Sequence, residues 1–259
     1  MGSHRLLRKI VPRTLLSRLG VSEGIERMAF NEKLDVREDI LSKYGFDGDL
    51  LNLFVNNKGY PVHKWHHYIP IYDHYFSKFR DRKVKFLEIG VFKGGSLQMW
   101  REYFGPDATI FGIDTDAQCK ELDGIAGQVR IGSQVDNDFM RNVVEEMGGV
   151  DIVLDDGSHQ AKHVRKTFQC LFPMMSPYSI YMIEDLHTSF WRGYGGGYRS
   201  KSNFFSFAND LINDMHHFWH VNPIKYPKLA DLCSGIHFHD SIAVFERGNV
   251  FKPTHSVIS

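Results

Sequence analysis

Short apolar runs alternate with longer amphipathic stretches between about residues 84 and 183. Short runs bounded by turn residues are typical of buried strands, whereas the longer stretches repeat apolar positions every three to four residues, as helices do. The runs predict strands at 84–89, 109–113, 129–131, 150–154 and 179–183, with helices at 96–103, 139–147 and 162–171. Alternation of strand and helix predicts right-handed crossovers and a parallel sheet.

The two ends of the chain follow other patterns. Residues 34–44, 50–56 and 67–79 have helical periodicity, so we expect residues 1–80 to form a helical N-terminal extension. Apolar runs at 235–239 and 241–246 have only Asp240 between them, which indicates an antiparallel hairpin. For residues 81–259 the pattern predicts an α/β, Rossmann-like, doubly wound, mostly parallel seven-stranded sheet with this hairpin at its C-terminal end.

Composition narrows the class of protein. The 31 basic and 31 acidic residues cancel, so no overall field attracts polyanions and we expect no nucleic-acid partner. The three cysteines lie far apart and form no CxxC pair, which favours a reducing compartment, the cytoplasm, over a disulfide framework or a Cys-based zinc site. No uncharged run reaches the roughly 20 apolar residues that a membrane-spanning helix needs.

The first twenty residues are basic and contain no acid, and their leucine and isoleucine residues recur at roughly helical spacing. A basic amphipathic helix can make peripheral contact with a membrane surface or dock on a partner chain. A short packing helix, broken near Pro12, is the alternative. The sequence leaves both interpretations open.

Residues 88–95, Glu-Ile-Gly-Val-Phe-Lys-Gly-Gly, follow one predicted strand and open a helix. Gly90 and Gly94 allow a tight turn and a close approach of the backbone to a ligand. The dinucleotide fingerprint would need glycine where Phe92 stands, so this spacing instead suits a nucleoside with a charged amino-acid tail. An ordinary tight turn is the alternative, but Asp114 ends the next strand, where an acid can accept both ribose hydroxyls. Gln134, after the third strand, could reach the adenine edge, and Asp136 could cap the following helix.

Acidic residues gather after the fourth and fifth strands, in Asp155-Asp-Gly-Ser-His159 and in Glu184-Asp185. Both groups belong to the same sheet edge as the glycine segment. Crowded carboxylates repel one another unless a cation or a shared proton neutralises them, and hard oxygen ligands favour Mg²⁺, Mn²⁺ or Ca²⁺. Helix capping is the alternative, by Asp156 and Ser158 after the fourth strand and by Glu184 or Asp185 after the fifth. His159 could take a proton from a substrate hydroxyl, or could simply be a polar surface residue.

The motifs at 155–159 and 183–185, with Thr-Ser-Phe-Trp at 188–191, resemble the metal-dependent sugar O-methyltransferases of macrolide biosynthesis and related mycobacterial polysaccharide O-methyltransferases. The resemblance implies that Asp156, Glu184 and Asp185 hold Mg²⁺ and that His159 is the general base. It implies S-adenosylmethionine, with S-adenosylhomocysteine as product. The residues expected around this cofactor are Glu88, Gly90, Gly94, Ser96, Asp114, Gln134 and Asp155, with Tyr68 and Tyr72 added from a family-like upstream segment.

The resemblance therefore predicts an O-methyltransferase that acts on a hydroxyl of a sugar, a glycosylated natural product or a polysaccharide, and a homo-oligomer. The glycine- and aromatic-rich stretch at about 186–203 suits a mobile lid. Two departures matter: only some 80 residues precede the predicted fold, where the macrolide enzymes carry a larger auxiliary domain, and Ser133 stands where an acid is expected. A catechol-type methyltransferase and a non-catalytic cofactor-binding subunit are the alternatives.

Overall fold

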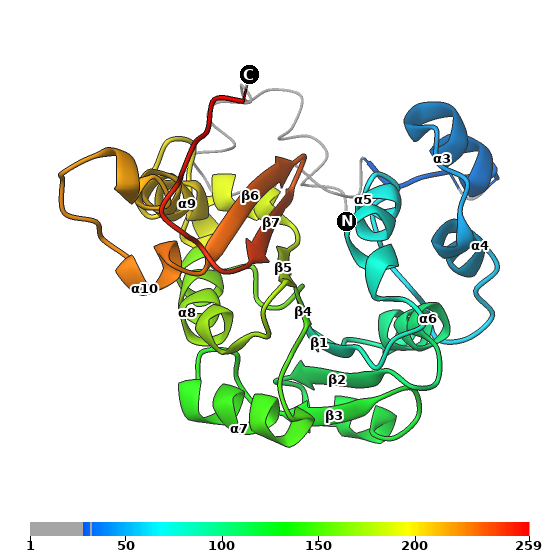
Figure 1. Ribbon diagram of the computed structural model, residues 1–259. Coiled ribbons are helices and arrows are strands. Elements are labelled where there is room, and N and C mark those ends of the chain that lie inside the picture. Colours follow the sequence, from blue (N-terminus) through cyan, green and yellow to red (C-terminus); the bar gives the residue numbers. More distant parts are fainter. Residues whose placement is uncertain (1–27, 32, 259) are drawn as a thin grey trace, which may run out of the picture.

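The computed structural model describes residues 28–31 and 33–258, so the basic segment of the first twenty residues lies outside the described part. A seven-stranded sheet forms the centre, in the order β3-β2-β1-β4-β5-β7-β6 (Figure 1). Its strands are β1 (Lys85–Ile89), β2 (Thr109–Asp114), β3 (Gln128–Ile131), β4 (Ile152–Asp155), β5 (Ser179–Ile183), β6 (Cys233–His239) and β7 (Ile242–Arg247).

The strands pair as the sequence pattern predicts. Strands β1 to β5 are parallel, and β7 runs antiparallel between β5 and β6. The C-terminal hairpin is confirmed, although its turn contains Ser241 as well as Asp240, because β7 begins only at Ile242. Ser241 has φ 65°, the left-handed conformation that reverses the chain here.

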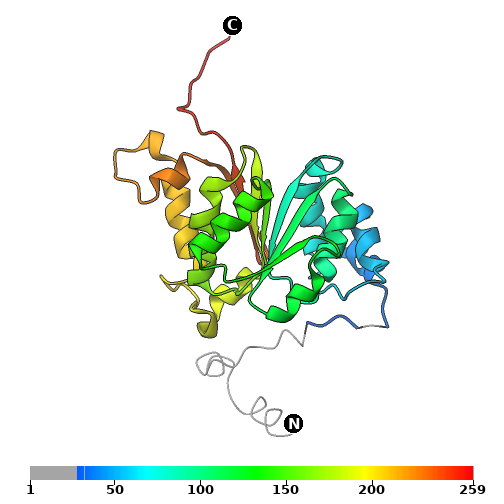
Figure 2. The same cartoon turned by 90° about the horizontal axis from the view of Figure 1, so that it is seen from below.

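Helices cover both faces of the sheet (Figure 2). The α-helices are α3 (Val36–Tyr44), α4 (Asp49–Val55), α5 (Tyr68–Phe76), α6 (Gly95–Phe104), α7 (Asn137–Met147), α8 (Ala161–Leu171), α9 (Phe204–Asp214) and α10 (Pro227–Ala230). The 3₁₀ helices are η2 (Ser77–Phe79), η3 (Ala117–Leu122), η4 (Phe172–Met174), η5 (Leu186–Phe190), η6 (Arg192–Tyr194) and η7 (His217–Trp219).

Successive strand residues point to opposite hydrophobic clusters, as the two-residue period of a strand requires. Phe86 packs in the cluster with α3 to α6, whereas its neighbour Leu87 packs in the cluster with α7 to α10. A strand buried on both faces reads as a continuous apolar run, which is why the periodicity located the strands to within two residues.

The described part of the N-terminal extension is packed against the sheet. Tyr72 of α5 contacts the ring of Trp100 on α6 edge to face at 5.3 Å, and Phe76 contacts Phe86 of β1 at 6.2 Å. Helices α3 to α5 thus share one hydrophobic cluster with β1 and α6. The division of the chain at residue 80 stays a prediction. Because these helices share a cluster with β1, the segment just before α5 is held close to the carboxyl ends of the strands.

Helix α9 was not among the predicted helices. Its buried residues Phe204, Phe207, Ala208 and Leu211 recur at helical spacing, and the side chain of Asn203 caps it. The expected capping of α7 by Asp136 is confirmed. No helix of residues 28–31 and 33–258 is long and apolar enough to cross a membrane.

Candidate active site

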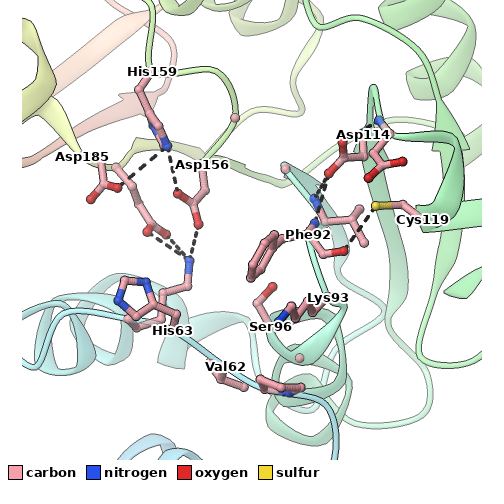
Figure 3. A pocket seen from close by; sticks show the side chains of 18 of the residues that line it. Val62, His63, Phe92, Lys93, Ser96, Asp114, Cys119, Asp156, His159 and Asp185 are labelled. Atoms are coloured by element: carbon pink, nitrogen blue, oxygen red, sulfur yellow. Dashed lines mark hydrogen bonds and ion pairs between the residues drawn. The ribbon is translucent and has the colours of Figure 1, made fainter. Parts of the chain in front are cut away.

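A cavity of about 480 Å³ opens at the carboxyl ends of β1, β2, β4 and β5. Figure 3 shows its two walls: Phe92, Ser96 and Asp114 belong to one, and Asp156, His159 and Asp185 to the other. A second hollow of about 330 Å³ shares Gly90, Asp114 and Gly157 with the first and continues toward Gln134. The two hollows together form an elongated site at the edge where parallel α/β sheets bind ligands. We call the wall with the glycine loop and Asp114 the ligand wall, and the wall with Asp156, His159 and Asp185 the acidic wall.

The glycine loop is shaped by its own protein neighbours. Gly90 has φ 97°, and a Cβ there would lie 2.2 Å from the carbonyl oxygen of Asp156. A Cβ on Gly95 would lie 2.2 Å from the carbonyl oxygen of Pro61. Gly90 was expected to allow the approach of a ligand. Here, backbone of the residue after β4 and of the segment before α5 already fills the space beside Gly90 and Gly95.

Asp114 holds the glycine loop to the end of β2. Its Oδ2 accepts hydrogen bonds from the backbone N–H groups of Val91 (2.9 Å) and Phe92 (3.0 Å), and its Oδ1 accepts one from Asp116 (2.9 Å). Burial acts to raise the pKa of Asp114, but these backbone donors outweigh it and lower the pKa. An ionised carboxylate therefore borders both hollows, as the ribose-binding prediction requires.

Glu88 lies beneath the glycine loop and has no exposed surface. Ser96 Oγ donates to its Oε2 at 2.8 Å, and Trp100 Nε1 donates to its Oε1 at 3.4 Å. Burial raises the pKa of Glu88 to about 7, although Lys64 opposes the shift. Both Glu88 and Ser96 were expected at the cofactor. Ser96 lines the cavity, whereas Glu88 supports Ser96 from below, and the cofactor contacts of both stay a prediction.

Gln134 and Asp155 also hold the site from behind. Gln134 Nε2 donates to Asp155 Oδ1 (3.2 Å) and to Thr167 Oγ1 (3.1 Å), while its Oε1 accepts from the backbone of Ser158 (2.8 Å). The hydroxyl of Tyr181 donates to Asp155 Oδ2 at 2.9 Å, and burial raises the pKa of Asp155 to about 6. Gln134 lines the second hollow, but its side-chain amide is already hydrogen-bonded within the protein. Its contact with adenine stays a prediction, as does the contact of Asp155 with the cofactor.

The acidic wall brings together Asp156, His159 and Asp185, whose potential ligand atoms all lie within 4.8 Å of one another. His159 Nε2 is 3.9 Å from Asp156 Oδ1 and 3.8 Å from Asp185 Oδ2. His159 and Asp185 have φ values of 53° and 56°, and Phe92 on the opposite wall has 51°. Left-handed conformations of non-glycine residues cost free energy and concentrate at functional sites.

The capping alternative for these acids is not supported. Helix α8 begins only at Ala161, and its N-cap residue Gln160 makes no side-chain capping bond. Asp185 stands at the N-cap of η5, but its side chain makes no capping bond either. The carboxylates of Asp156 and Asp185 instead face the cavity, where both line the acidic wall (Figure 3).

Lys64 is the functional candidate that the sequence analysis missed. Its Nζ lies 2.6 Å from Asp156 Oδ2 and 2.9 and 3.0 Å from the two carboxylate oxygens of Glu184. Burial acts to lower the pKa of Lys64, but Asp156 and Glu184 outweigh it and raise the pKa, so the ammonium is charged. No motif announces this lysine, because its partners are 92 and 120 residues away.

Aromatic residues next to Lys64 hold Asp185. Trp65 Nε1 donates to Asp185 Oδ1 at 3.1 Å, and the hydroxyl of Tyr68 donates to the same oxygen at 2.8 Å. Tyr72 is fully buried beneath them. Tyr68 and Tyr72 were expected at the cofactor; that role stays a prediction, and the contact that the structure gives Tyr68 is with a carboxylate.

Comparisons with known proteins point to methyltransferases. Residues 87–186 match the model of a methyltransferase domain family. The 8-demethyl-8-(2-methoxy-alpha-L-rhamnosyl)-tetracenomycin-C 3'-O-methyltransferase of Streptomyces olivaceus is 36% identical over 213 residues, 78% of this chain and 54% of that protein. The mycinamicin VI 2''-O-methyltransferase of Micromonospora griseorubida is 33% identical over 195 residues, 71% of this chain and 48% of that protein.

A solved structure gives the same picture. MycE methyltransferase from the mycinamycin biosynthetic pathway, in complex with Mg, SAH and mycinamycin VI, superposes with a TM-score of 0.67 and 28% sequence identity, covering 96% of this chain and 62% of that one. The chain spans about half the length of the curated relatives that it matches. Its fold is Rossmann-like, residues 87–186 match a methyltransferase domain family, and the chain is similar to proteins named as O-methyltransferases.

Proposed function

We propose that this chain is an S-adenosylmethionine-dependent O-methyltransferase that uses a divalent cation and acts on a hydroxyl of a glycoside. The observation that carries the proposal is the meeting, in one cavity, of the glycine loop and Asp114 with the cluster of Asp156, His159 and Asp185. The O-methyltransferase activities for which the relatives are named, and the Mg and SAH of the MycE complex, support it.

The ligand wall suits a nucleoside with an amino-acid tail. Asp114 stands where the two hollows meet, so its carboxylate could accept hydrogen bonds from ribose hydroxyls, with the adenine in the hollow beside Gln134. The tail would then lie toward Ser96 along the larger hollow. When bound, S-adenosylmethionine supplies a methyl group on a sulfonium centre, which a nucleophilic oxygen can displace.

The acidic wall fits a divalent cation. Its carboxylates are hard oxygen ligands of the type that Mg²⁺ prefers. The Asp156 and Asp185 side chains keep 24% and 23% of their surface exposed, so a cation could reach their carboxylates from the cavity. Asp156 and Asp185 would hold the cation, with Glu184 as the third expected ligand. When bound, the cation supplies a Lewis acid that lowers the pKa of an acceptor hydroxyl and fixes its orientation.

His159 is the proposed general base. Among the described residues nothing hydrogen-bonds to its ring, and its Nε2 points toward the cavity between Asp156 and Asp185 (Figure 3). Nε2 could take the proton of the attacking hydroxyl while oxygen forms its bond to the methyl carbon. A catechol-type reaction with a lysine base is less well supported, because Lys64 is held as an ammonium by two carboxylates.

The acceptor could bind beside Asp185. An apolar hollow of about 260 Å³ lies there, lined among others by Trp65, His187, Phe190 and Trp191. Aromatic rings present flat apolar surfaces, which suit the apolar face of a sugar. His187, Phe190 and Trp191 belong to the segment 186–203, which we propose as the lid over the acceptor.

The proposal is tested by incubating the full chain with S-adenosylmethionine labelled in its methyl group, Mg²⁺ and a panel of rhamnosylated and other deoxysugar glycosides. We expect label to enter at least one glycoside, to stop on addition of EDTA and to resume with excess Mg²⁺ or Mn²⁺. The same panel should include a catechol and a free polysaccharide. Transfer to the catechol alone would contradict the glycoside assignment, and undiminished transfer in EDTA would contradict the cation.

A further inference from the structure

We propose that Lys64 is a resident cation of the acidic wall, which shares Asp156 and Glu184 with the divalent ion and so weakens the binding of that ion. This inference rests on the proposed function and adds a residue to it. It concerns the chain's own charge balance, which can be measured without any acceptor.

The contacts of Lys64 divide the carboxylate oxygens into two groups. Nζ bonds to Asp156 Oδ2 and to both oxygens of Glu184. Asp185 Oδ1 is taken by Trp65 and Tyr68. The oxygens left without these partners are Asp156 Oδ1 and Asp185 Oδ2, the two that flank His159. Glu184, expected from sequence as a full metal ligand, is therefore first of all the partner of a lysine.

Lys64 is fixed in place on several sides. Its side chain is 3% exposed, and its ammonium lies 5.7 Å from the ring centroid of Tyr72. The segment that carries it passes so close to the glycine loop that a Cβ on Gly95 would lie 2.2 Å from Pro61 O. Withdrawing Lys64 would leave the buried carboxyl group of Glu184, 2% exposed, without its cationic partner, which should destabilise the fold.

The charge of Lys64 has two consequences for cation binding. It offsets the repulsion between Asp156 and Glu184 and so helps to hold these two acids together. It would also repel a divalent ion held by Asp156 and Asp185, in a site where water screens charge poorly. Removing the ammonium should therefore destabilise the metal-free protein and tighten metal binding at the same time, a combination that an ordinary buried salt bridge far from a cation site would not produce.

The test measures Mn²⁺ binding by electron paramagnetic resonance of the free ion, and thermal unfolding with and without Mn²⁺. The variants are Lys64→Met, Lys64→Arg, and Lys93→Met as the matched control. Lys93 lines the same cavity, but no ion pair joins it to the described acids. The double variant Lys64→Met/Glu184→Gln, which removes both charges of the pair, covers the case in which Lys64→Met alone does not fold.

We expect Lys64→Met to bind Mn²⁺ at least about tenfold more tightly than the wild type, since a neighbouring positive charge is gone. It should unfold at a lower temperature, and Mn²⁺ should restore most of that loss. Lys93→Met and Lys64→Arg should bind Mn²⁺ like the wild type, and the double variant should recover stability without tighter binding.

The inference is overturned if Lys64→Met binds Mn²⁺ no more tightly than Lys93→Met, or if Mn²⁺ restores no stability to it. If Lys64→Met does not fold even with Mn²⁺, a double variant that stays unstable overturns it too. The proposed function fails differently: label transfer that persists in EDTA refutes its cation requirement, whatever Lys64→Met shows.

Discussion

The two walls of the cavity are held in different ways. On the ligand wall, polar groups and glycines meet the chain's own backbone: Asp114 accepts three backbone N–H groups, and Gly90 closes against the Asp156 carbonyl. On the acidic wall, charged side chains meet other side chains, and His159 has carboxylate oxygens only at 3.8 and 3.9 Å. One wall is complete within the fold, whereas the other has groups still free to bind a ligand.

This difference separates recognition from chemistry. Backbone contacts cost little reorganisation when a ligand enters, so the ligand wall can serve as a rigid cradle. On the acidic wall, the free carboxylate oxygens could hold a cation, and His159, whose backbone is held in a left-handed conformation, could accept a proton. We therefore expect substitutions on the acidic wall to affect turnover and those on the ligand wall to affect cofactor affinity or folding.

The largest effect should come from His159→Ala. Loss of a general base slows a reaction by about 10²–10⁴-fold, and the ligand wall is untouched. Label transfer should fall by that factor, while calorimetry with S-adenosylhomocysteine should give an unchanged dissociation constant. His74→Ala, an exposed histidine on α5, is the matched control. Retained transfer by His159→Ala would remove the base from the acidic wall.

The second-largest effect concerns the glycine loop, where backbone strain and steric clash can be measured separately. Gly90→Ala and Gly124→Ala both place a side chain at positive φ, 97° and 82°, but only at Gly90 does the new Cβ meet backbone, whereas at Gly124 it meets nothing within 4 Å. Gly90→Ala should lose about 2–3 kcal/mol more free energy of unfolding than Gly124→Ala. Chemical denaturation measures both, and equal losses would show that the Asp156 backbone is not the obstacle.

The pH dependence of stability probes Glu88, beneath the ligand wall. Burial raises its folded-state pKa from 4.5 to about 7, so the folded protein holds the proton more tightly than the unfolded chain. The stability this gives is complete below pH 4.5 and is lost as pH rises through about 7. The free energy of unfolding of the wild type should fall by about 2–3 kcal/mol more over this window than that of Glu88→Gln. Parallel pH curves would show that Glu88 titrates normally.

The smallest effect should come from Asp114→Asn. Replacing an ionised acceptor by an amide weakens a charge-assisted hydrogen bond to ribose by about 1.4 kcal/mol, or tenfold in affinity. Calorimetry with S-adenosylhomocysteine should detect this, with Asp107→Asn on the exposed surface as the control. Unchanged affinity would mean that Asp114 serves the glycine loop alone.

Local pattern was enough to predict one wall better than the other. The strands, the glycine loop and Asp114 follow from residues close in sequence, because backbone turns and strand ends are local features. The acidic residues were also found, since the carboxyl ends of parallel strands share an edge. Their partners were not: Lys64 and Trp65 precede α5 and reach the acids only because α5 packs on the sheet.

Burial explains the remaining differences. Glu88, Gln134 and Asp155 are of residue types that often contact ligands. These residues are only 0%, 7% and 1% exposed, and their side chains form hydrogen bonds within the protein. Sequence indicates that a polar residue lies near a strand end and does not indicate which way the fold turns it. Helix α9 was not predicted, although its sequence shows apolar residues at helical spacing and Asn203 as an N-cap.

The most direct test of the account is a crystal structure of the full chain with S-adenosylhomocysteine and Mn²⁺, in which anomalous scattering locates the metal. We predict one Mn²⁺ peak coordinated by Asp156 and Asp185 beside His159, with the nucleoside against Asp114. A peak elsewhere, or the nucleoside outside the glycine loop, would contradict the assignment of the two walls.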